Sequence, residues 1–301
     1  MNAFSFSINT MLMRFAFSLL TLGSAILLII TATGIPTANA QITVMSYNVR
    51  YDNPNDAPNN WDNRKERVAT LIQFYEPAFV GTQEALFHQL EDLAYNLHSY
   101  RWIGKGRKDG KREGEFSAIL YDTTKVKLVA GSDSTIWLSK TPDVPSKNWD
   151  AALPRILTWA KFKLKSSGRH LFVFNTHFDH VGDTARLESA KIIIETIQRI
   201  AGDNPVVLTG DFNITDDTEP YHILNSSFLT DAYTETTLPP IGPIFTFNGF
   251  SVADTSNQNR IDYLFTNDQV DVLKYAVIAA FKNGYYPSDH LPVLTVLELN
   301  Q

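Results

Sequence analysis

The sequence contains no cysteine among its 301 residues. This absence excludes both a scaffold held together by disulfide bonds and a metal site built from thiolates. Any metal ion that the chain binds must therefore be held by carboxylates, amides or imidazoles.

Basic side chains are scarce relative to acidic ones. The chain has 26 Lys and Arg residues against 32 Asp and Glu residues, a formal net charge of −6. Broad, non-specific binding to duplex nucleic acid relies on clusters of Lys and Arg, so this balance argues against it. A phosphate-bearing substrate that is reached through a few local cations stays compatible with the composition.

One long apolar run is present, from Phe15 to Ile30. Arg14 precedes it and the small-x-small sequence Ala38-Asn39-Ala40 follows it, an order typical of a cleaved signal peptide. A retained membrane anchor, the alternative, would need about 20 unbroken apolar residues. We therefore expect residues 1–40 to be a signal peptide. Residues 41–301 should then be secreted, to the periplasm or beyond, as a monomer without stable membrane association.

The exported part suits one large α/β domain better than two independent ones. Helices are predicted from Asn63, as a capping residue, and from Thr184, each with apolar residues on one face. The strands that alternation and short apolar runs predict are Ile42–Tyr47, Ala78–Thr82, Ser117–Tyr121, Val126–Ala130, Arg155–Leu164, His170–Asn175, Val206–Leu208, Arg260–Phe265 and Leu291–Leu297. We expect the third and fourth of these to pair, and the fifth and sixth. The order strand, helix, strand occurs in both halves, which predicts one domain built as two similar halves.

Polar side chains stand where the predicted strands end. The clearest case is Val206–Asn213, in which a buried apolar run reaches Gly210 and then presents Asp211 and Asn213. In layered α/β folds this end of the sheet is where sites usually lie. The full ordered set is Asn48, Gln83-Glu84, Asn175-Thr176-His177, Gly210-Asp211-Phe212-Asn213, Arg260-Ile261-Asp262-Tyr263 and Ser288-Asp289-His290.

This ordered set resembles the endonuclease/exonuclease/phosphatase superfamily, the deoxyribonuclease-I-like fold, over essentially all of Gln41–Leu299. The stretches Ser46–Asp52 and Trp149–Arg155 are similar to a secreted bacterial branch of it. The resemblance implies a four-layer α/β sandwich, in which two packed mixed β-sheets are flanked by helices. It also implies a divalent-metal-dependent phosphoesterase, in which an activated water attacks phosphorus in line.

The metal ligands that the resemblance implies are oxygen donors. Asn48 and Glu84 form a pair suited to Mg²⁺ or Mn²⁺, and Asp289 would complete a second metal position. An alternative for Glu84 is a surface acid that begins the next helix. Some nucleases of this fold carry an acid two residues after the first Asn, whereas this chain has Arg50 there.

Two histidine–carboxylate pairs are implied as well. Asp262 would orient His290, and Glu115 would orient His177, because a carboxylate on one ring nitrogen fixes the tautomer. His290 would then act as base or phosphate contact.

Beside the two histidine–carboxylate pairs, Asp211 would orient or deprotonate the attacking water. Asn213 would hold water and a phosphate oxygen. Arg155 resembles a phosphate-contacting arginine, although a solvated one explains it equally well. His180 could reach the site, but an ordinary loop histidine is the favoured interpretation. Trp61 and Trp149 could stack a base or sugar, although packing is the commoner use of tryptophan.

The substrate is the least determined feature. A phosphodiesterase or nuclease acting on nucleic acid or nucleotides is favoured, and a phosphomonoesterase or a lipid or sugar phosphoesterase is the alternative. The tryptophan motif of inositol phosphatases is absent from Leu208–Asn213. An inactive binding module, a different class, should lack metal or base residues, and the core set here is complete.

Overall fold

The structure is a computed structural model that describes residues 41–226, 228–252 and 259–300. The predicted signal peptide over residues 1–40 lies outside the described residues. Within those three ranges, no helix combines the length and apolar character that crossing a membrane requires.

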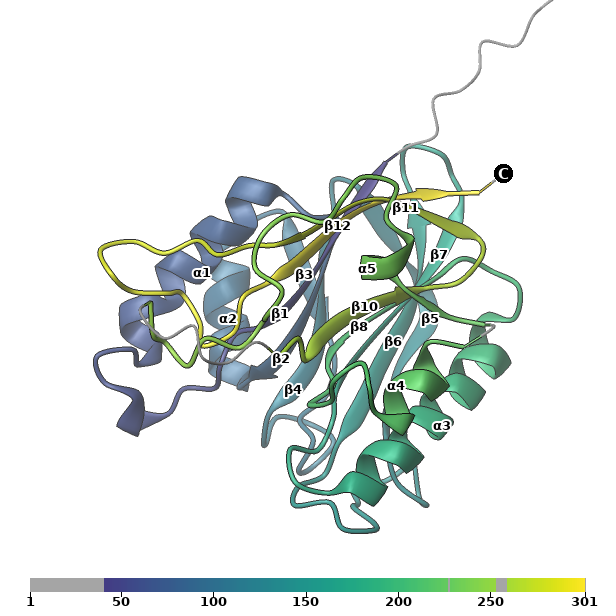
Figure 1. The fold of residues 1–301 in the computed structure, drawn as a ribbon, viewed down its shortest axis with the longest axis horizontal. Coiled ribbons are helices and arrows are strands. Elements are labelled where there is room, and N and C mark those ends of the chain that lie inside the picture. Colours follow the sequence, from purple (N-terminus) through teal and green to yellow (C-terminus); the bar gives the residue numbers. More distant parts are fainter. Residues whose placement is uncertain (1–40, 227, 253–258, 301) are drawn as a thin grey trace, which may run out of the picture. The chain divides into compact units, whose positions relative to one another are not determined.

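Two apolar strands, parallel to each other, lie at the centre of the first sheet. The sheet has the order β11-β12-β1-β2-β4-β3 (Figure 1). β1 and β2 are parallel and joined through helix α1, and every other pair is antiparallel. Helix α2 follows β2. The bounds are β1 (Ile42–Asn48), η1 (Pro54–Asp56), α1 (Trp61–Tyr75), β2 (Phe79–Ala85), α2 (Phe87–Asn96), β3 (Tyr100–Ile103), β4 (Phe116–Asp122), β11 (Val270–Val277) and β12 (Val293–Leu299).

The second sheet repeats this plan with the order β5-β6-β7-β8-β10-β9. β7 and β8 are parallel and joined through α3, and their neighbours are antiparallel. The prediction of two similar halves is therefore confirmed. The bounds are β5 (Val126–Trp137), β6 (Ile156–Leu164), β7 (His170–His177), α3 (Asp183–Ala201), β8 (Val206–Asp211), α4 (Glu219–Leu224), β9 (Thr230–Asp231), α5 (Ala232–Glu235) and β10 (Asp262–Thr266).

Alternation along the central strands separates three apolar layers. In β1, Val44 packs between the two sheets, whereas Met45 and Tyr47 face α1 and α2. In β8, Val207 faces the first sheet and Leu208 faces the α3 side. Helices thus cover the outer face of each sheet, and the predicted four-layer α/β sandwich is confirmed.

The two parallel pairs explain where the polar strand ends gather. Parallel strands end at the same edge of a sheet. In register, Asn48 lies beside Gln83 at the end of β1 and β2, and His177 lies beside Asp211 at the end of β7 and β8. Because the sheets pack face to face, the two edges meet.

Two details of the prediction are wrong. Helix α1 begins at Trp61 rather than after Asn63, because Asn60 is its capping residue and Asn63 lies inside its first turn. The strands predicted at Ser117–Tyr121 and Val126–Ala130 do not pair. The short turn between them carries the chain from one sheet to the other, so β4 pairs with β2 and β3 while β5 pairs with β6.

Candidate active site

One oxygen of Asp211 lies at the centre of the polar groups. Asp211 Oδ2 accepts a hydrogen bond from Asn48 Nδ2 at 2.9 Å, and lies 3.5 Å from His177 Nε2 and 3.7 Å from His290 Nε2. Its other oxygen accepts from the backbone N–H of Asn213 at 3.1 Å. Strand ends from both sheets therefore converge on a single buried carboxylate.

His290 is paired as the sequence predicts. Its Nδ1 lies 2.8 Å from Asp262 Oδ2, and the ring of Phe247 lies edge-on 5.1 Å away. Burial alone would lower the pKa of His290, but the carboxylates of Asp262 and Asp211 outweigh it and raise that pKa well above its ordinary value. His290 is therefore an imidazolium at neutral pH and a hydrogen-bond donor toward the site.

The same crowding of carboxylates acts on Asp211. Burial, followed by the negative charge of Asp262, raises the pKa of Asp211 to about 7. This shift belongs to the site without a cation, and a divalent cation beside Asp211 would favour the carboxylate and lower the pKa again.

His177 lacks the hydrogen bond to Glu115 that the resemblance implies. Its Nδ1 lies 3.8 Å from Glu115 Oε2, which is too long for a hydrogen bond. Glu115 instead accepts from Arg107 Nη2 at 2.6 Å. Burial and then the charges of Arg155 and Arg107 lower the pKa of His177 well below its usual value, so this imidazole is neutral. Glu115 thus acts chiefly on Arg107.

Arg155 is held in the site by an adjoining loop. Its Nε lies 3.3 Å from Asp179 Oδ2, and its Nη2 lies 3.0 Å from His180 Nδ1. Asp179 also accepts from the backbone N–H groups of Ala152, Leu153, Val181 and Gly182. The buried Nη1 of Arg155 has no hydrogen-bond partner among the described residues. Arg155 therefore has one donor group to offer to a ligand.

Two carboxylates and one imidazole, at the edge where the strand ends of the two sheets meet, are close enough together to bind a divalent cation. Ligand atoms of Glu84, Asp211 and His290 all lie within 4.8 Å of one another. The residue at Glu84 adopts a left-handed backbone conformation with φ of 66°, which turns its carboxylate off the end of β2. The two carboxylates match the oxygen preference of Mg²⁺ and Mn²⁺, whereas the imidazole of His290 is already paired with Asp262.

Asn48 and Asp289 fit the metal prediction less directly. The amide nitrogen of Asn48 donates to Glu84 Oε1, while its oxygen accepts from the backbone N–H of Arg50. Asn48 would become an oxygen ligand only after its amide turned over. Asp289 lies 3.6 Å from the guanidinium of Arg50, which also lies 3.8 Å from Glu84. Arg50 thus places a positive charge beside the position predicted for a second metal.

Most of these side chains line one cleft of about 600 Å³, whereas Asn48, Asp179 and Asp262 are buried and are not among its lining residues. Sequence reasoning did not single out Arg107, which a loop before β4 brings in, and gave little weight to His180. No spacing signal marks Arg107, whereas the sequence His177-Phe178-Asp179-His180 did indicate that the second histidine could reach the site. The cleft is lined by Arg50, Tyr51, Glu84, Arg107, Glu115, Leu153, Arg155, His177, His180, Asp211, Asn213, Phe247, Ile261, Asp289 and His290.

Three residues that the sequence analysis considered for the site do not line the cleft. Asn175 is fully buried between the sheets, where Gln83 Nε2 donates to its Oδ1 at 2.7 Å. Trp61 is buried against α2, and its Nε1 donates to Asp92 at 2.8 Å, so it packs rather than stacks a ligand. Trp149 is absent from the residues that line the cleft.

Comparisons with known proteins agree with this geometry. Residues 45–290 match the profile described as Endonuclease/Exonuclease/phosphatase family. An endonuclease/exonuclease/phosphatase from Bacteroides vulgatus is 40% identical, with a TM-score of 0.83 over 87% of this chain and 100% of that one. A mannosyl-6-phosphatase from Bacteroides thetaiotaomicron is 38% identical, with a TM-score of 0.80 over 85% of this chain and 99% of that one.

A more distant likeness concerns the fold alone. The TDP2 protein of D. rerio, solved with a single-strand DNA product, is 18% identical with a TM-score of 0.68. That match covers 86% of this chain and 100% of the other.

Proposed function

Since the chain belongs to the endonuclease/exonuclease/phosphatase family of phosphoesterase hydrolases, we propose that it removes the phosphate of a sugar phosphomonoester with the help of a divalent cation. The relative at 38% identity that acts on a mannosyl 6-phosphate supports the sugar class. Phosphodiester cleavage, which the sequence analysis favours, is the competing function.

The observation that carries the proposal is the concentration of donors around Asp211. Arg107 and Arg155 are buried guanidinium groups, and His180 and the protonated His290 line the same cleft. A phosphomonoester carries close to two negative charges at neutral pH, whereas a diester carries one. The free Nη1 of Arg155 and the imidazole of His290 each offer a donor to a phosphoryl oxygen, and a monoester presents one more charged oxygen to them than a diester does.

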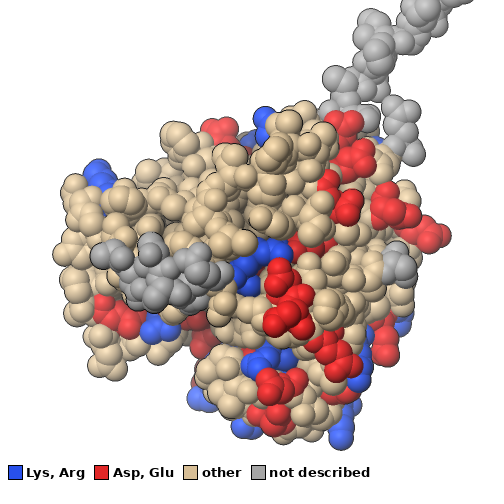
Figure 2. Space-filling model, viewed as in Figure 1, with Lys and Arg blue, Asp and Glu red and all other residues tan. Residues whose placement is uncertain are grey.

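On the face that Figure 2 draws, the described residues form no extended basic surface for a polyanion. Figure 2 shows basic side chains in small, separate groups on this face, with acidic side chains between them. Polynucleotide binding depends on a continuous row of phosphate contacts. This distribution therefore favours a small phosphorylated substrate that is bound inside the cleft.

The chain's own groups divide the chemistry among them. A cation held by Glu84 and Asp211 would neutralise charge on the phosphoryl oxygens. His290 donates to one phosphoryl oxygen, and Arg155 and Arg107 hold the others. Asp211 orients the attacking water and accepts its proton, while the P–O ester bond breaks on the opposite side of phosphorus and the departing sugar oxygen takes a proton from solvent water.

A comparison of ester classes tests the proposal. Residues 41–301 would be assayed with mannose 6-phosphate, p-nitrophenyl phosphate and bis(p-nitrophenyl) phosphate, each with Mg²⁺, Mn²⁺ or EDTA. We expect metal-dependent turnover of both monoesters, with kcat/KM at least about 100-fold above that of the diester. Preferential turnover of the diester would replace the proposed function with a phosphodiesterase.

Secretion is the second part of the proposal. The apolar run Phe15–Ile30 and the cleavage sequence Ala38-Asn39-Ala40 support export. N-terminal sequencing of the protein made from the full chain should begin at Gln41, and size-exclusion chromatography should give a monomer. A retained Met1 in the cell fraction would contradict the export proposal.

A further inference from the structure

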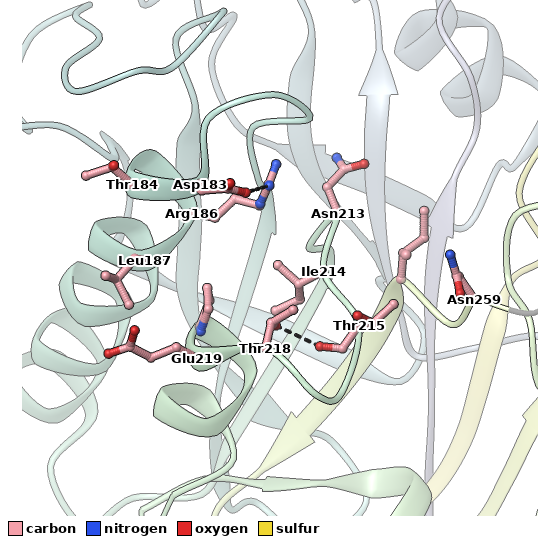
Figure 3. Close-up of a pocket in the computed structure, with 12 residues that line it drawn as sticks. Asp183, Thr184, Arg186, Leu187, Asn213, Ile214, Thr215, Thr218, Glu219 and Asn259 are labelled. Carbon is pink, nitrogen blue, oxygen red and sulfur yellow. Dashed lines mark hydrogen bonds and ion pairs between the residues drawn. The ribbon is translucent and has the colours of Figure 1, made fainter.

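A second hollow, here called the side pocket, adjoins the catalytic cleft. Asn213 and Ile261 line both, so the two hollows share a wall. Figure 3 shows the side pocket with Asp183, Arg186 and Leu187 at the start of α3 on one side and Asn259 on the other. Its volume is about 630 Å³. Like the catalytic cleft, it has the size of a ligand pocket, for which ~300–1,000 Å³ is usual.

The charges of the side pocket do not suit a second phosphate. Its described lining contains the carboxylates of Asp183 and Glu219 and one guanidinium, that of Arg186. Arg186 is already paired with Asp183 and donates to the backbone oxygen of Asp179. The next phosphate of a nucleic acid would therefore meet net negative charge, which disfavours a polynucleotide.

The remaining groups suit a neutral, hydroxyl-rich molecule. The hydroxyl groups of Thr215 and Thr218 and the amide of Asn213 line the pocket and already donate to Asp217, to the backbone oxygen of Thr215 and to that of Phe178. Their oxygens, like the two carboxylates, can still accept hydrogen bonds from sugar hydroxyl groups. Leu187 and Pro220 add apolar surface of the kind that the C–H faces of a sugar can cover. Among the described residues that line the pocket none is aromatic, so a nucleobase would find no ring on which to stack.

We propose that the side pocket binds the uncharged sugar unit next to the phosphorylated one, so that the substrate is a phosphorylated oligosaccharide rather than a free sugar phosphate. This inference rests on the proposed function. The phosphate would lie beside Asp211 and the neighbouring sugar beyond Asn213, which borders both hollows. Contacts in the side pocket would then add binding energy that a monosaccharide cannot use.

The test compares three substrates of increasing reach: p-nitrophenyl phosphate, mannose 6-phosphate, and mannobiose with one 6-phosphate. Leu187→Trp fills the side pocket. It should leave the fold intact, because Leu187 is half-buried and is not part of the apolar layer between the second sheet and α3. Glu219→Gln removes an exposed carboxylate without changing its shape. Gln198→Trp, at an exposed position three turns along α3, is the matched control.

We expect the wild type to have about tenfold higher kcat/KM for the phosphorylated mannobiose than for mannose 6-phosphate. Leu187→Trp should lose this advantage and Glu219→Gln should reduce it, while neither changes turnover of p-nitrophenyl phosphate and Gln198→Trp changes nothing. Equal kcat/KM for the two sugars, or an advantage that survives both pocket variants, would overturn the side-pocket proposal. Turnover of p-nitrophenyl phosphate with none of either sugar phosphate would instead contradict the proposed function.

Discussion

At the scale of single residues, Asp211 is placed where its charge is costly. It is buried, and the carboxylates of Asp262 and Glu84 act on it in the same sense, while Asn48 and His290 only partly offset them. Without a bound cation, the fold therefore shifts Asp211 toward its protonated form relative to the unfolded chain. Such a group serves catalysis at the expense of stability, a combination expected at active sites.

The substitution Asp211→Asn tests this reading through pH. Because the pKa of Asp211 is raised from 3.8 to about 7, the contribution of Asp211 to stability becomes less favourable as pH rises through this window. At pH 8 without metal, Asp211→Asn should stabilise the protein by about 1–2 kcal/mol and raise Tm by roughly 2–4 °C per kcal/mol, whereas at pH 4 it should have little effect. Thermal unfolding at both pH values measures this. Asp203→Asn, at an exposed position, is the control, and a lower Tm for Asp211→Asn at pH 8 would contradict the reading.

At the scale of elements, α1 holds two site-bearing loops through one buried arginine. Arg64 donates to the backbone oxygens of Val49, Arg50 and Tyr51 after β1, and to that of Pro287 just before Ser288-Asp289-His290. Its side chain is almost fully buried. The guanidinium therefore ties the loop after Asn48 to the segment that carries His290.

Replacing this arginine should affect both stability and catalysis. Lysine has one ammonium group and cannot reach four carbonyl oxygens in the geometry of a guanidinium. We expect Arg64→Lys to lower the free energy of unfolding by about 3 kcal/mol and to reduce kcat more than it raises KM. Urea unfolding and steady-state kinetics measure the two effects. Arg67→Lys, on the next turn of the same helix, is the matched control and should have a much smaller effect on both, because Arg67 is only half-buried and donates to one backbone oxygen, that of Asn63.

The sequence predicts an element well when the contacts that determine it join residues close together in the chain, and poorly when those residues are far apart in the chain. Alternation along Ile42–Tyr47 and the apolar run at Val206–Leu208 reveal their strands, because burial on a sheet leaves a local pattern. Arg64 looks like an ordinary polar residue of a helix, since its partner Pro287 lies 223 positions away. The false pairing of Ser117–Tyr121 with Val126–Ala130 has the same origin: a short connection fits a hairpin, but core packing divides the strands between sheets.

Some residues of the site can be predicted from the sequence and others cannot. Residues at strand ends, such as Glu84 and Asp211, follow from strand order and parallel pairing. Arg107 could not be predicted, because the loop that carries it has no periodic pattern. The choice of Glu115 between Arg107 and His177 is likewise a matter of side-chain geometry that spacing does not encode.

At the scale of the whole molecule, the two halves are joined by a buried polar cluster beneath the site. Gln83 and Thr209 both donate to Asn175 Oδ1, and Asn175 Nδ2 donates to the backbone oxygens of Thr82 and Ala118. This cluster links β2 and β4 of one sheet to β7 and β8 of the other. It fixes how the two sets of strand ends face each other.

Gly81 is the residue that allows this close approach. A Cβ atom there would lie 2.0 Å from Thr209 Oγ1 and 2.6 Å from Asn175 Oδ1. Gly81→Ala should therefore force the sheets apart, destabilise the protein by more than about 3 kcal/mol, and lower activity through displaced strand ends. Denaturant unfolding measures the change, with the exposed loop substitution Ser166→Ala as control. A loss below about 1 kcal/mol would show that the cluster does not set the spacing of the sheets.

The most direct measurement is release of p-nitrophenol from p-nitrophenyl phosphate by residues 41–301, as wild type and as Asp211→Ala, with Mg²⁺ and after EDTA treatment. Circular dichroism of both proteins confirms their fold. A metal-dependent hydrolase centred on Asp211 predicts turnover that EDTA abolishes and that Asp211→Ala reduces by at least about 10³-fold. A folded Asp211→Ala protein with activity within tenfold of wild type, or full activity in EDTA, would contradict the account.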